Sequence, residues 1–340
     1  MNAWVTETRL AHLGVILAQL FFSGFHVVAA AVLTKENNVD PLMFAFWREL
    51  LSCVFMLVVA LRCSSPAESS QLRWPRLCDW LGFAICGYCS CSNVVGSLFA
   101  LNYLRPTQFS VMQPVIPVVA AVFNARQESL STRRVLGVLC SVAGAILVSS
   151  QLQFSKVSGP ESSSKGADTN TTLGFVIAAV QVTSMATLVT IQQPLLQEEG
   201  YDSTWFTLWY YSIGALFTVL FVIQQAMSPH GLDAVISNPS VWLGILYAAV
   251  FATTFPFNAF SYAGKHLQAG TITLYVALQP LFTSLLSTFF LDSHPSLLDA
   301  AGAALVVTGL IVTVDHQRGE RPSQPAKDWQ PLSHPHSPIE

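Results

Sequence analysis

The sequence predicts an all-α integral membrane protein with ten transmembrane helices, arranged as two inverted five-helix repeats. Three observations lead to this fold class. Of the 340 residues, 52% are hydrophobic and only 10% are charged, against about 25% charged in an ordinary soluble domain. Apolar runs long enough to cross a hydrocarbon core of about 30 Å recur along the chain. Short stretches of the first half also recur in the second half at a nearly constant separation.

The apolar runs define the predicted spans. They cover residues 11–33, 41–61, 79–103, 106–124, 134–152, 173–195, 203–224, 240–263, 268–291 and 297–315. The first run contains Gln19 and His26, and no small-residue cleavage site follows it. We therefore interpret it as a membrane span and not as a signal peptide.

The remaining residues divide the chain into segments. These are an N-terminal segment 1–10, a first repeat 11–152, a linker 153–172, a second repeat 173–315 and a tail 316–340. The tail is rich in Pro, Ser and His without an apolar pattern, which predicts disorder. Most Lys and Arg residues fall on one side of the predicted spans, so both termini are expected in the cytoplasm and the linker outside or in a lumen. The linker holds Asn170 and Thr172, which fit a glycosylation acceptor.

Charge and cysteine content restrict the partners. The net charge is −3 and the basic residues are scattered, which argues against a nucleic-acid partner. Cys86, Cys89 and Cys91 are close in sequence, but at helical spacing Cys91 turns away from the face that the other two share. We interpret these thiols as packing residues and expect no metal site.

The two halves share a set of residues in a common order. Trp80-Leu81-Gly82 recurs as Trp242-Leu243-Gly244. At the same separation, Asp40, Phe44 and Trp47 recur as Asp202, Phe206 and Trp209. At slightly longer separations, Gln113-Pro114 recurs as Gln279-Pro280, and Gly137 and Gly144 recur as Gly302 and Gly309. The chain is therefore a tandem repeat. Five spans per copy is an odd number, so the second copy enters the membrane in the opposite orientation. Inverted repeats build secondary transporters, because exchange of conformation between the copies opens a central site to either side in turn.

Arg48 is the sharpest candidate for a functional residue. It lies about 10 Å into its predicted span at 1.5 Å per residue, where an arginine is costly unless it is paired or faces a watery cavity. Its neighbour Glu49 cannot face it, because adjacent helix residues point apart. Arg48 either anchors a substrate carboxylate, bonds to carbonyls of broken helices as a gate residue, or only holds two helices together. Glu49 is either a proton-coupling group or a contact to a neighbouring helix.

Other polar residues inside the spans extend the candidate site. Gln113 and Gln279 precede prolines at equivalent repeat positions, and each serves either substrate contact or helix packing. The rest of the expected polar lining is Gln19, His26, Asn93, Gln181 and Asn258. Aromatic walls for an organic solute are expected from Phe46, Trp47, Trp209, Tyr210 and Tyr275.

Sequence signatures of enzymes are missing. There is no P-loop, no Gly-rich dinucleotide turn, no HExxH and no supported nucleophile elbow in the sequence. We therefore expect neither an enzymatic activity nor a cofactor.

The chain resembles the drug/metabolite transporter superfamily, whose members contain two EamA-type repeats of five helices. Residues about 10 to 315 are covered by this resemblance. It looks closest to the plant nodulin-like, or UmamiT, branch, on the stretches "LAQLFFSG" with Gln19 and "PLMFAFWR" with Arg48. The late second-repeat motif is similar to "GTITLYVALQPL", where Gln279 replaces the usual Asn before proline.

The resemblance implies a carrier whose central cavity is lined by the first four helices of each repeat. Members of the branch move amino acids or auxin-like aromatic acids, either down their gradients or with protons. We therefore predict an alternating-access secondary transporter of small organic metabolites, most of all amino acids or related carboxylate-bearing solutes such as auxin-like acids. The alternative is a non-transporting membrane receptor or scaffold that retains the fold.

The expected partners are a small-molecule substrate and the lipid bilayer, and a homodimer is left open. The plasma membrane is the expected location, with the vacuolar or another endomembrane as alternatives.

Overall fold

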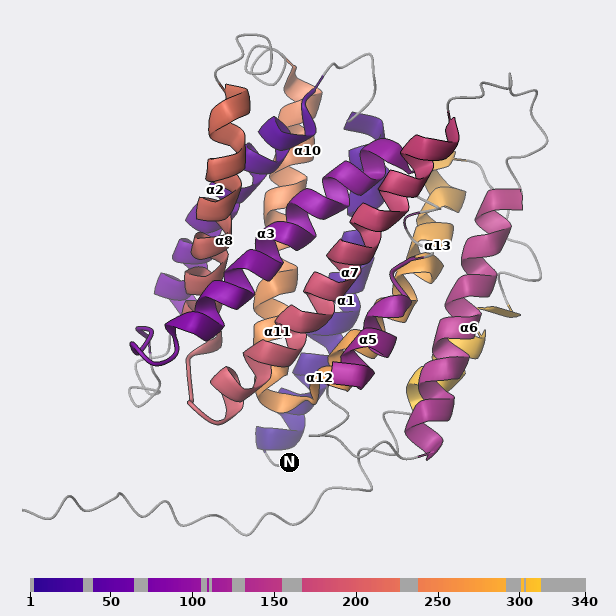
Figure 1. Cartoon of the computed structure of the whole chain (residues 1–340). Helices are drawn as coiled ribbons and strands as arrows, with labels where there is room; N and C mark the ends of the chain where they lie inside the picture. Colours follow the sequence, from indigo (N-terminus) through magenta and orange to yellow (C-terminus); the bar gives the residue numbers. More distant parts are fainter. Residues whose placement is uncertain are drawn as a thin grey trace, which may run out of the picture.

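A computed structural model of the chain shows a bundle of long helices (Figure 1). The structure describes residues 3–32, 39–63, 73–104, 109, 112–123, 132–154, 167–226, 238–291, 301–302 and 304–312. The regular secondary structure of these residues is helical throughout. Six of the helices are apolar and long enough to cross a membrane. The predicted class of an all-α, multi-pass membrane protein is confirmed at this level.

The helices follow the predicted spans closely. In the first half they are α1 (Ala3–Val32), α2 (Pro41–Cys63), α3 (Trp80–Tyr103), α5 (Val115–Phe123) and α6 (Thr132–Phe154). In the second half they are α7 (Ala167–Gln197), α8 (Ser203–Ala226), α10 (Pro239–Ala249), the π-helix η2 (Val250–Thr254), α11 (Phe255–His266), α12 (Ala269–Leu274), the 3₁₀-helix η3 (Tyr275–Leu278) and α13 (Gln279–Leu291). Residues 301–302 and 304–312 are also helical.

Two helices extend beyond the predicted segment boundaries. Helix α1 begins at Ala3, inside the predicted N-terminal segment, and α7 begins at Ala167, inside the predicted linker. The apolar pattern marks only the part of a helix that lies in hydrocarbon, and polar turns continue past it. Asn170 thus lies in the first turns of a helix and not in a loop. The middle of the linker and the tail 316–340 are outside the described residues.

Proline interrupts three of the predicted spans. The Gln113–Pro114 pair forms a turn before α5, in which the Ile116 N–H donates to Gln113 O at 3.0 Å. The equivalent pair, Gln279–Pro280, begins α13 directly after the η3 turn. Pro256 follows the π-helix η2. Proline lacks the N–H that an α-helix needs four residues after each carbonyl, so the regular register ends at these points.

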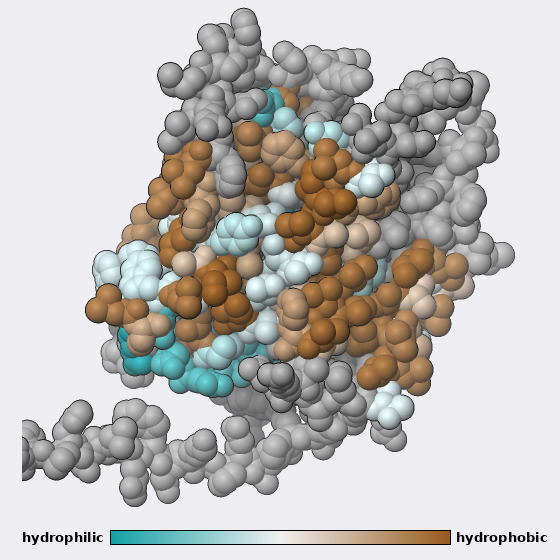
Figure 2. Space-filling model, in the orientation of Figure 1, coloured by the Kyte–Doolittle hydropathy of each residue, from teal (hydrophilic) through white to brown (hydrophobic). Residues whose placement is uncertain are grey.

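The two halves interleave in the bundle. Helix α2 packs against α8, α3 packs against α7 and α8, and α1 packs against α11 and α13. Helix α6 stands at the edge of the bundle (Figure 1). Apolar side chains cover much of the visible outer face (Figure 2), and large ones such as Leu81 and Leu243 are mostly exposed. Such a surface fits lipid rather than water.

Repeated aspartates begin equivalent helices in the two halves. The Asp40 Oδ1 accepts a hydrogen bond from Leu42 N at 2.7 Å before α2. The Asp202 Oδ1 accepts from Thr204 N at 3.0 Å before α8. Both side chains satisfy N–H groups that have no partner within the helix. The recurrence of Asp at this position therefore has a structural cause.

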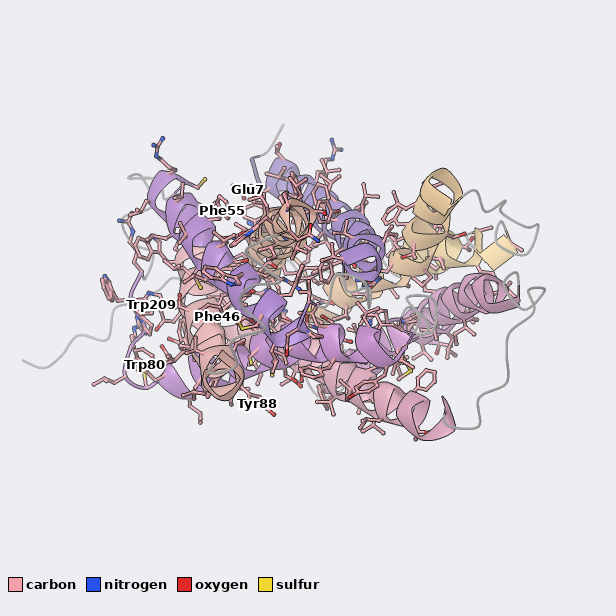
Figure 3. All side chains as sticks on the ribbon, turned by 90° about the horizontal axis from the view of Figure 1, so that it is seen from above. Glu7, Phe46, Phe55, Trp80, Tyr88 and Trp209 are labelled. Atoms are coloured by element: carbon pink, nitrogen blue, oxygen red, sulfur yellow. The ribbon has the colours of Figure 1, made fainter. Side chains whose placement is uncertain are left out.

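Tryptophan contacts between the halves come as a reciprocal pair. Trp47 packs against Trp242 with ring centroids 5.3 Å apart, and Trp209 packs against Trp80 at 6.3 Å. Trp80 and Trp209 lie at one edge of the bundle (Figure 3). The repeat alignment places Trp47 on Trp209 and Trp80 on Trp242. Exchange of the halves therefore converts one contact into the other.

Glycine contacts repeat the same relation. A Cβ added to Gly144 would lie 2.5 Å from Gly302 O, and one added to Gly309 would clash with Gly137 O. The repeat alignment places Gly137 on Gly302 and Gly144 on Gly309. The absence of side chains at these positions lets two helix backbones approach closely, as is common in membrane helix pairs.

Candidate functional site

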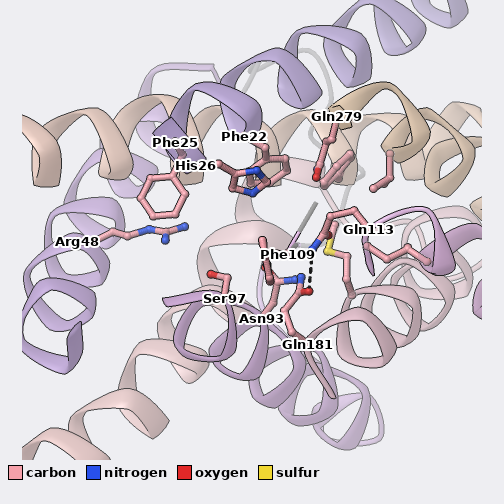
Figure 4. Close-up of a pocket in the computed structure, with 14 residues that line it drawn as sticks. Phe22, Phe25, His26, Arg48, Asn93, Ser97, Phe109, Gln113, Gln181 and Gln279 are labelled. Carbon is pink, nitrogen blue, oxygen red and sulfur yellow. Dashed lines mark hydrogen bonds between the residues drawn. The ribbon is translucent and has the colours of Figure 1, made fainter. Parts of the chain in front are cut away.

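A buried cavity lies between helices from both halves. Only about 30 Å³ of its space would admit a molecule the size of water. Fourteen residues line it, and they come from α1, α2, α3, α7, α11 and the broken spans around α5 and α13 (Figure 4). The cavity is therefore narrow in this conformation.

Six of the eight predicted substrate-binding residues meet at this cavity. They are His26, Arg48, Asn93, Gln113, Gln181 and Gln279. Gln19 does not line it but bonds to Gln279, which does. Asn258 lies away from it, and its Nδ2 donates to Thr254 O at 2.7 Å within its own helix. That bond gives Asn258 a local role in place of the predicted lining role.

Arg48 is buried, with 2% of its surface exposed, and is held on three sides. Its Nε donates to Thr253 Oγ1 at 2.8 Å, and its Nη2 donates to Ala252 O at 3.3 Å. Its guanidinium lies 4.6 Å from the centre of the Phe25 ring, a favourable cation–π contact. The remaining nitrogen, Nη1, has no hydrogen-bond partner.

The Ala252 carbonyl is available to Arg48 because of Pro256. In a regular helix the N–H of residue 256 would bond to that carbonyl, but proline has none. Arg48 thus bonds to the carbonyl of a broken helix, a contact that both the gate role and the helix-joining role would use. Arg48 lines the cavity and its Nη1 has no partner, so the bonds to Thr253 and Ala252 still leave the guanidinium a donor for a ligand.

Two glutamine pairs flank the cavity in a reciprocal arrangement. The Gln113 Nε2 donates to Gln181 Oε1 at 3.2 Å, and the Gln279 Nε2 donates to Gln19 Oε1 at 2.8 Å. Gln279 is the repeat equivalent of Gln113, and Gln181 follows Gln19 at the separation that relates Trp47 to Trp209. Each pair joins one half to the other. The symmetric glutamines predicted from the sequence therefore each have a partner that the repeat comparison had not matched.

Several polar atoms of the lining residues lack partners. Besides Arg48 Nη1, these are His26 Nδ1 and Gln279 Oε1, and all three are buried. Buried polar groups in folded proteins nearly always have a hydrogen-bond partner. An arginine donor, an imidazole nitrogen and an amide acceptor in one cavity therefore indicate a place for a polar ligand or for water.

The aromatic part of the lining differs from the prediction. Its phenylalanines are Phe22, Phe25, Phe109 and Phe260, and the His26 ring stands at 85° to the Phe109 ring with centroids 5.3 Å apart. These rings give the cavity a largely apolar wall beside its few polar groups, as is usual for sites that bind small molecules.

The five aromatic residues expected from the sequence do not line the cavity. They are Phe46, Trp47, Trp209, Tyr210 and Tyr275. Trp47 and Trp209 pack at the tryptophan contacts described above, and the Tyr275 hydroxyl bonds to His12 Nδ1 at 2.8 Å. Phe46 and Trp47 adjoin Arg48 in the sequence, but neighbouring residues of a helix point to different faces.

Some lining residues that were missed carried a readable signal. Ser97 lies four residues after Asn93, Met185 four after Gln181, and Phe22 four before His26. Residues four apart share a helix face, so the predicted polar residues implied these neighbours. Phe109 likewise lies four residues before Gln113, whereas Phe260 had no such partner and required the three-dimensional arrangement.

Glu49 is also buried, at 2% exposure, but it does not line the cavity. The three cysteines Cys86, Cys89 and Cys91 are buried free thiols. Within the described residues, no group of three His, Cys, Asp or Glu side chains is placed to hold a metal ion.

Comparisons with known proteins match the whole membrane part of the chain. The EamA-like transporter family matches residues 9–150 and again residues 172–315. An uncharacterized transporter of Archaeoglobus fulgidus is 24% identical over 315 residues, covering 90% of this chain and 98% of that protein. An auxin-induced protein of Pinus taeda is 20% identical over 341 residues, covering 92% of this chain and 80% of that protein.

One solved crystal structure of a protein superposes with a TM-score of 0.69 at 18% identity, over 92% of this chain and 99% of the other. That likeness shows a shared fold. The two family matches together span most of the sequence, and the Archaeoglobus fulgidus transporter aligns with 90% of this chain. With its apolar helices, the chain therefore belongs to the EamA-like transporter family and is a multi-pass membrane transporter.

Proposed function

We propose that the protein is an alternating-access secondary transporter with ten spans in two inverted repeats, and that it carries small organic solutes bearing a carboxylate. Amino acids and auxin-like acids are the solute classes we favour. The observation that carries the proposal is the buried Arg48, which lines the cavity between the two halves and whose Nη1 has no partner.

The reciprocal contacts support the inverted repeat. The tryptophan, glycine and glutamine contacts each convert into their counterpart when the halves are exchanged. A two-fold relation of this kind is what two copies in opposite orientation produce. Because both copies can adopt the conformation of the other, the central cavity then opens to one side or to the other.

The lining favours a particular solute chemistry. Arg48 Nη1 is a charged donor that suits a carboxylate, and Gln279 Oε1 is an acceptor that suits an ammonium or another N–H group. Between them, Phe22, Phe25 and Phe109 suit a flat apolar body. An aromatic amino acid or an indole-type acid combines these three features.

The auxin-induced protein from Pinus taeda, at 20% identity, is a distant relative whose name is consistent with this solute class and with the nodulin-like branch.

We further propose that transport proceeds without enzymatic chemistry and that both termini face the cytoplasm. The plasma membrane is the proposed site of action, with the vacuolar or another endomembrane as alternatives. A receptor or scaffold that only retained the fold would not need unpartnered polar atoms around a central cavity, so the cavity favours the carrier.

Exchange of labelled solute across liposomes tests the proposal. Purified protein is reconstituted, and counterflow of radiolabelled L-tryptophan and indole-3-acetate is compared with protein-free liposomes. Arg48→Gln removes the charged donor, whose loss costs about 1.5–3 kcal/mol, so we expect exchange to fall by roughly tenfold or more. Arg48→Lys should restore little, since one ammonium cannot reproduce the bonds to Thr253, Ala252 and a solute together.

Two further variants separate transport from folding. Arg62→Gln changes an exposed arginine in the last turn of the same helix and should exchange at the wild-type rate. Ser97→Leu leaves Arg48 intact but fills the cavity, so it should also abolish exchange. The proposal is wrong if the wild type exchanges neither probe, or if Arg48→Gln and Ser97→Leu both exchange like the wild type.

A further inference from the structure

Glu49 is a buried acid without a partner. It lies in α2 with 2% of its surface exposed, and neither carboxyl oxygen has a hydrogen-bond partner. The ion pair found among the described residues is Arg76 with Glu199 at 2.9 Å, so Glu49 and Arg48 do not form one. A charged carboxylate in this position would have no direct counter-ion.

The groups that face Glu49 do not supply a counter-ion. Cys53 from its own helix, Cys91 from α3 and Tyr211 from α8 interact with it electrostatically. None of these three is a cation. The Thr218 hydroxyl also faces it from α8, but that hydroxyl donates to Gly214 O at 3.3 Å and shares a hydrogen bond with Cys91 Sγ at 3.2 Å.

Helices α10 and η2 also pack on α2, and α1 reaches it through Phe25, which contacts Phe44 and Arg48. The Thr253 hydroxyl of η2 is engaged by Arg48. The tyrosine of α10, Tyr247, donates to Phe21 O on α1 at 3.2 Å and so serves a different contact. Within the described residues, Arg48 is therefore the only positive group found to interact with Glu49 from α2 and the elements packed on it.

Burial of an unpaired carboxylate is costly, whereas the protonated carboxyl is neutral and avoids most of that cost. In this closed conformation the neutral form of Glu49 is thus favoured. With Glu49 neutral, the charge of Arg48 is not balanced by the protein. An anionic group in the adjacent cavity would balance it, so the two sites are linked through charge.

We propose that Glu49 is a proton-binding site coupled to solute binding at Arg48, so that a proton and a carboxylate-bearing solute cross together. This inference rests on the proposed function. The step begins when a solvent proton bonds to a Glu49 carboxylate oxygen and leaves Arg48 free to bind the solute. When the site opens to the other side, the O–H bond breaks, the proton returns to water, and the negative charge of the Glu49 carboxylate weakens the attraction of the Arg48 site for the anionic solute. No redox change or further reactant is involved.

Proteoliposomes distinguish coupling from carriage. With the membrane potential held at zero and the outside one pH unit more acidic, one proton per solute predicts about tenfold accumulation inside. We use L-tryptophan or indole-3-acetate, whichever the wild type exchanges in counterflow. Glu49→Gln mimics the protonated state, so it should keep counterflow and lose the accumulation. Glu198→Gln, at an exposed acid after α7, should retain both.

Two measurements on the wild type keep the test valid if Glu49→Gln does not fold. Solute added outside should acidify the interior, as reported by a trapped pH-sensitive dye. The infrared spectrum at neutral pH should show a protonated-carboxyl band that deuterium exchange shifts and that Glu198→Gln does not remove.

The coupling is refuted if solute enters without acidification, or if Glu49→Gln accumulates solute as the wild type does. Absence of wild-type counterflow with both probes instead contradicts the proposed function, and the infrared band still tests Glu49.

Discussion

The pairing of Gln19 with Gln279 allows a stringent test of the site's architecture. Gln19 has no exposed surface, and its Nε2 already lacks a partner. Its Oε1 accepts one bond, from Gln279 Nε2 at 2.8 Å. Gln279→Leu keeps the side-chain volume nearly constant but leaves the buried Gln19 amide with no bond at all. Gln19→Leu does the same to the Gln279 amide, whose Oε1 is also unpartnered.

The expected magnitude follows from two limits. A buried polar group that loses its partner costs about 1–3 kcal/mol in soluble proteins, whereas interhelical hydrogen bonds in a membrane protein average about 0.6 and reach about 1.7 kcal/mol. The short bond and full burial place each single variant in the range of about 1–2 kcal/mol. The double variant removes both amides together, so it should be less destabilised than the sum of the two by about 1 kcal/mol.

The assay is unfolding in mixed micelles as SDS replaces a mild detergent, followed by tryptophan fluorescence. Gln113 and Gln181 provide the matched comparison, because their bond is longer, at 3.2 Å, and should give a smaller coupling energy. Additive losses at Gln19 and Gln279 would show that the two amides do not bond in the folded protein. Equal, large coupling in both pairs would contradict the inferred dependence on distance.

Two further predictions concern stability. Gly144→Ala should destabilise the protein by about 1–3 kcal/mol, because its Cβ would lie 2.5 Å from Gly302 O, a backbone atom; Gly14→Ala, whose Cβ would make an ordinary 3.5 Å contact, is the matched control, and equal melting temperatures for the two variants would contradict the close approach. Tyr201→Phe should cost about 1–2 kcal/mol, since the hydroxyl donates to Asp79 Oδ2 at 2.7 Å and accepts from Arg76 N at 2.8 Å. Burial raises the pKa of Tyr201 to about 12, so this contribution should persist through neutral pH and disappear only as the pH rises past about 10 toward that value. A melting difference that vanishes near neutral pH would refute it.

Much of the fold was readable from the sequence because the membrane imposes simple constraints. Hydrocarbon thickness fixes the length of each apolar run, and α2 and α8 begin within a residue of their predicted starts, at Pro41 and Ser203. The interruptions were less predictable. Pro256 was recognised as a break, but the π-helix before it and the use of the freed Ala252 carbonyl by Arg48 depend on which helix packs alongside.

The candidate site was predictable where polarity itself was the signal. A buried glutamine or arginine in a span is costly, so Arg48 and Gln113 could be selected without a structure. Aromatic residues carry no such signal, because they also serve as packing and interface residues. Trp47 was therefore misassigned to the cavity wall, and Phe109 and Phe260, which do line it, were missed.

Glu49 is a charged residue that the second repeat does not duplicate, and its position shows where the two repeats differ in charge. The separation that relates Trp47 to Trp209 also relates Glu49 to Tyr211, and the two residues interact electrostatically between the packed helices α2 and α8. Exchange of the halves therefore returns this contact to itself, which places it on the axis of the proposed inverted repeat. The equivalent of Arg48 is Tyr210, which is also fully buried with an unpartnered hydroxyl. Two symmetric halves would hold the inward-open and outward-open states equal in energy. A single acid on the axis, beside a single arginine, breaks that equality by an amount that depends on protonation and on bound solute, which is the property a coupled carrier requires.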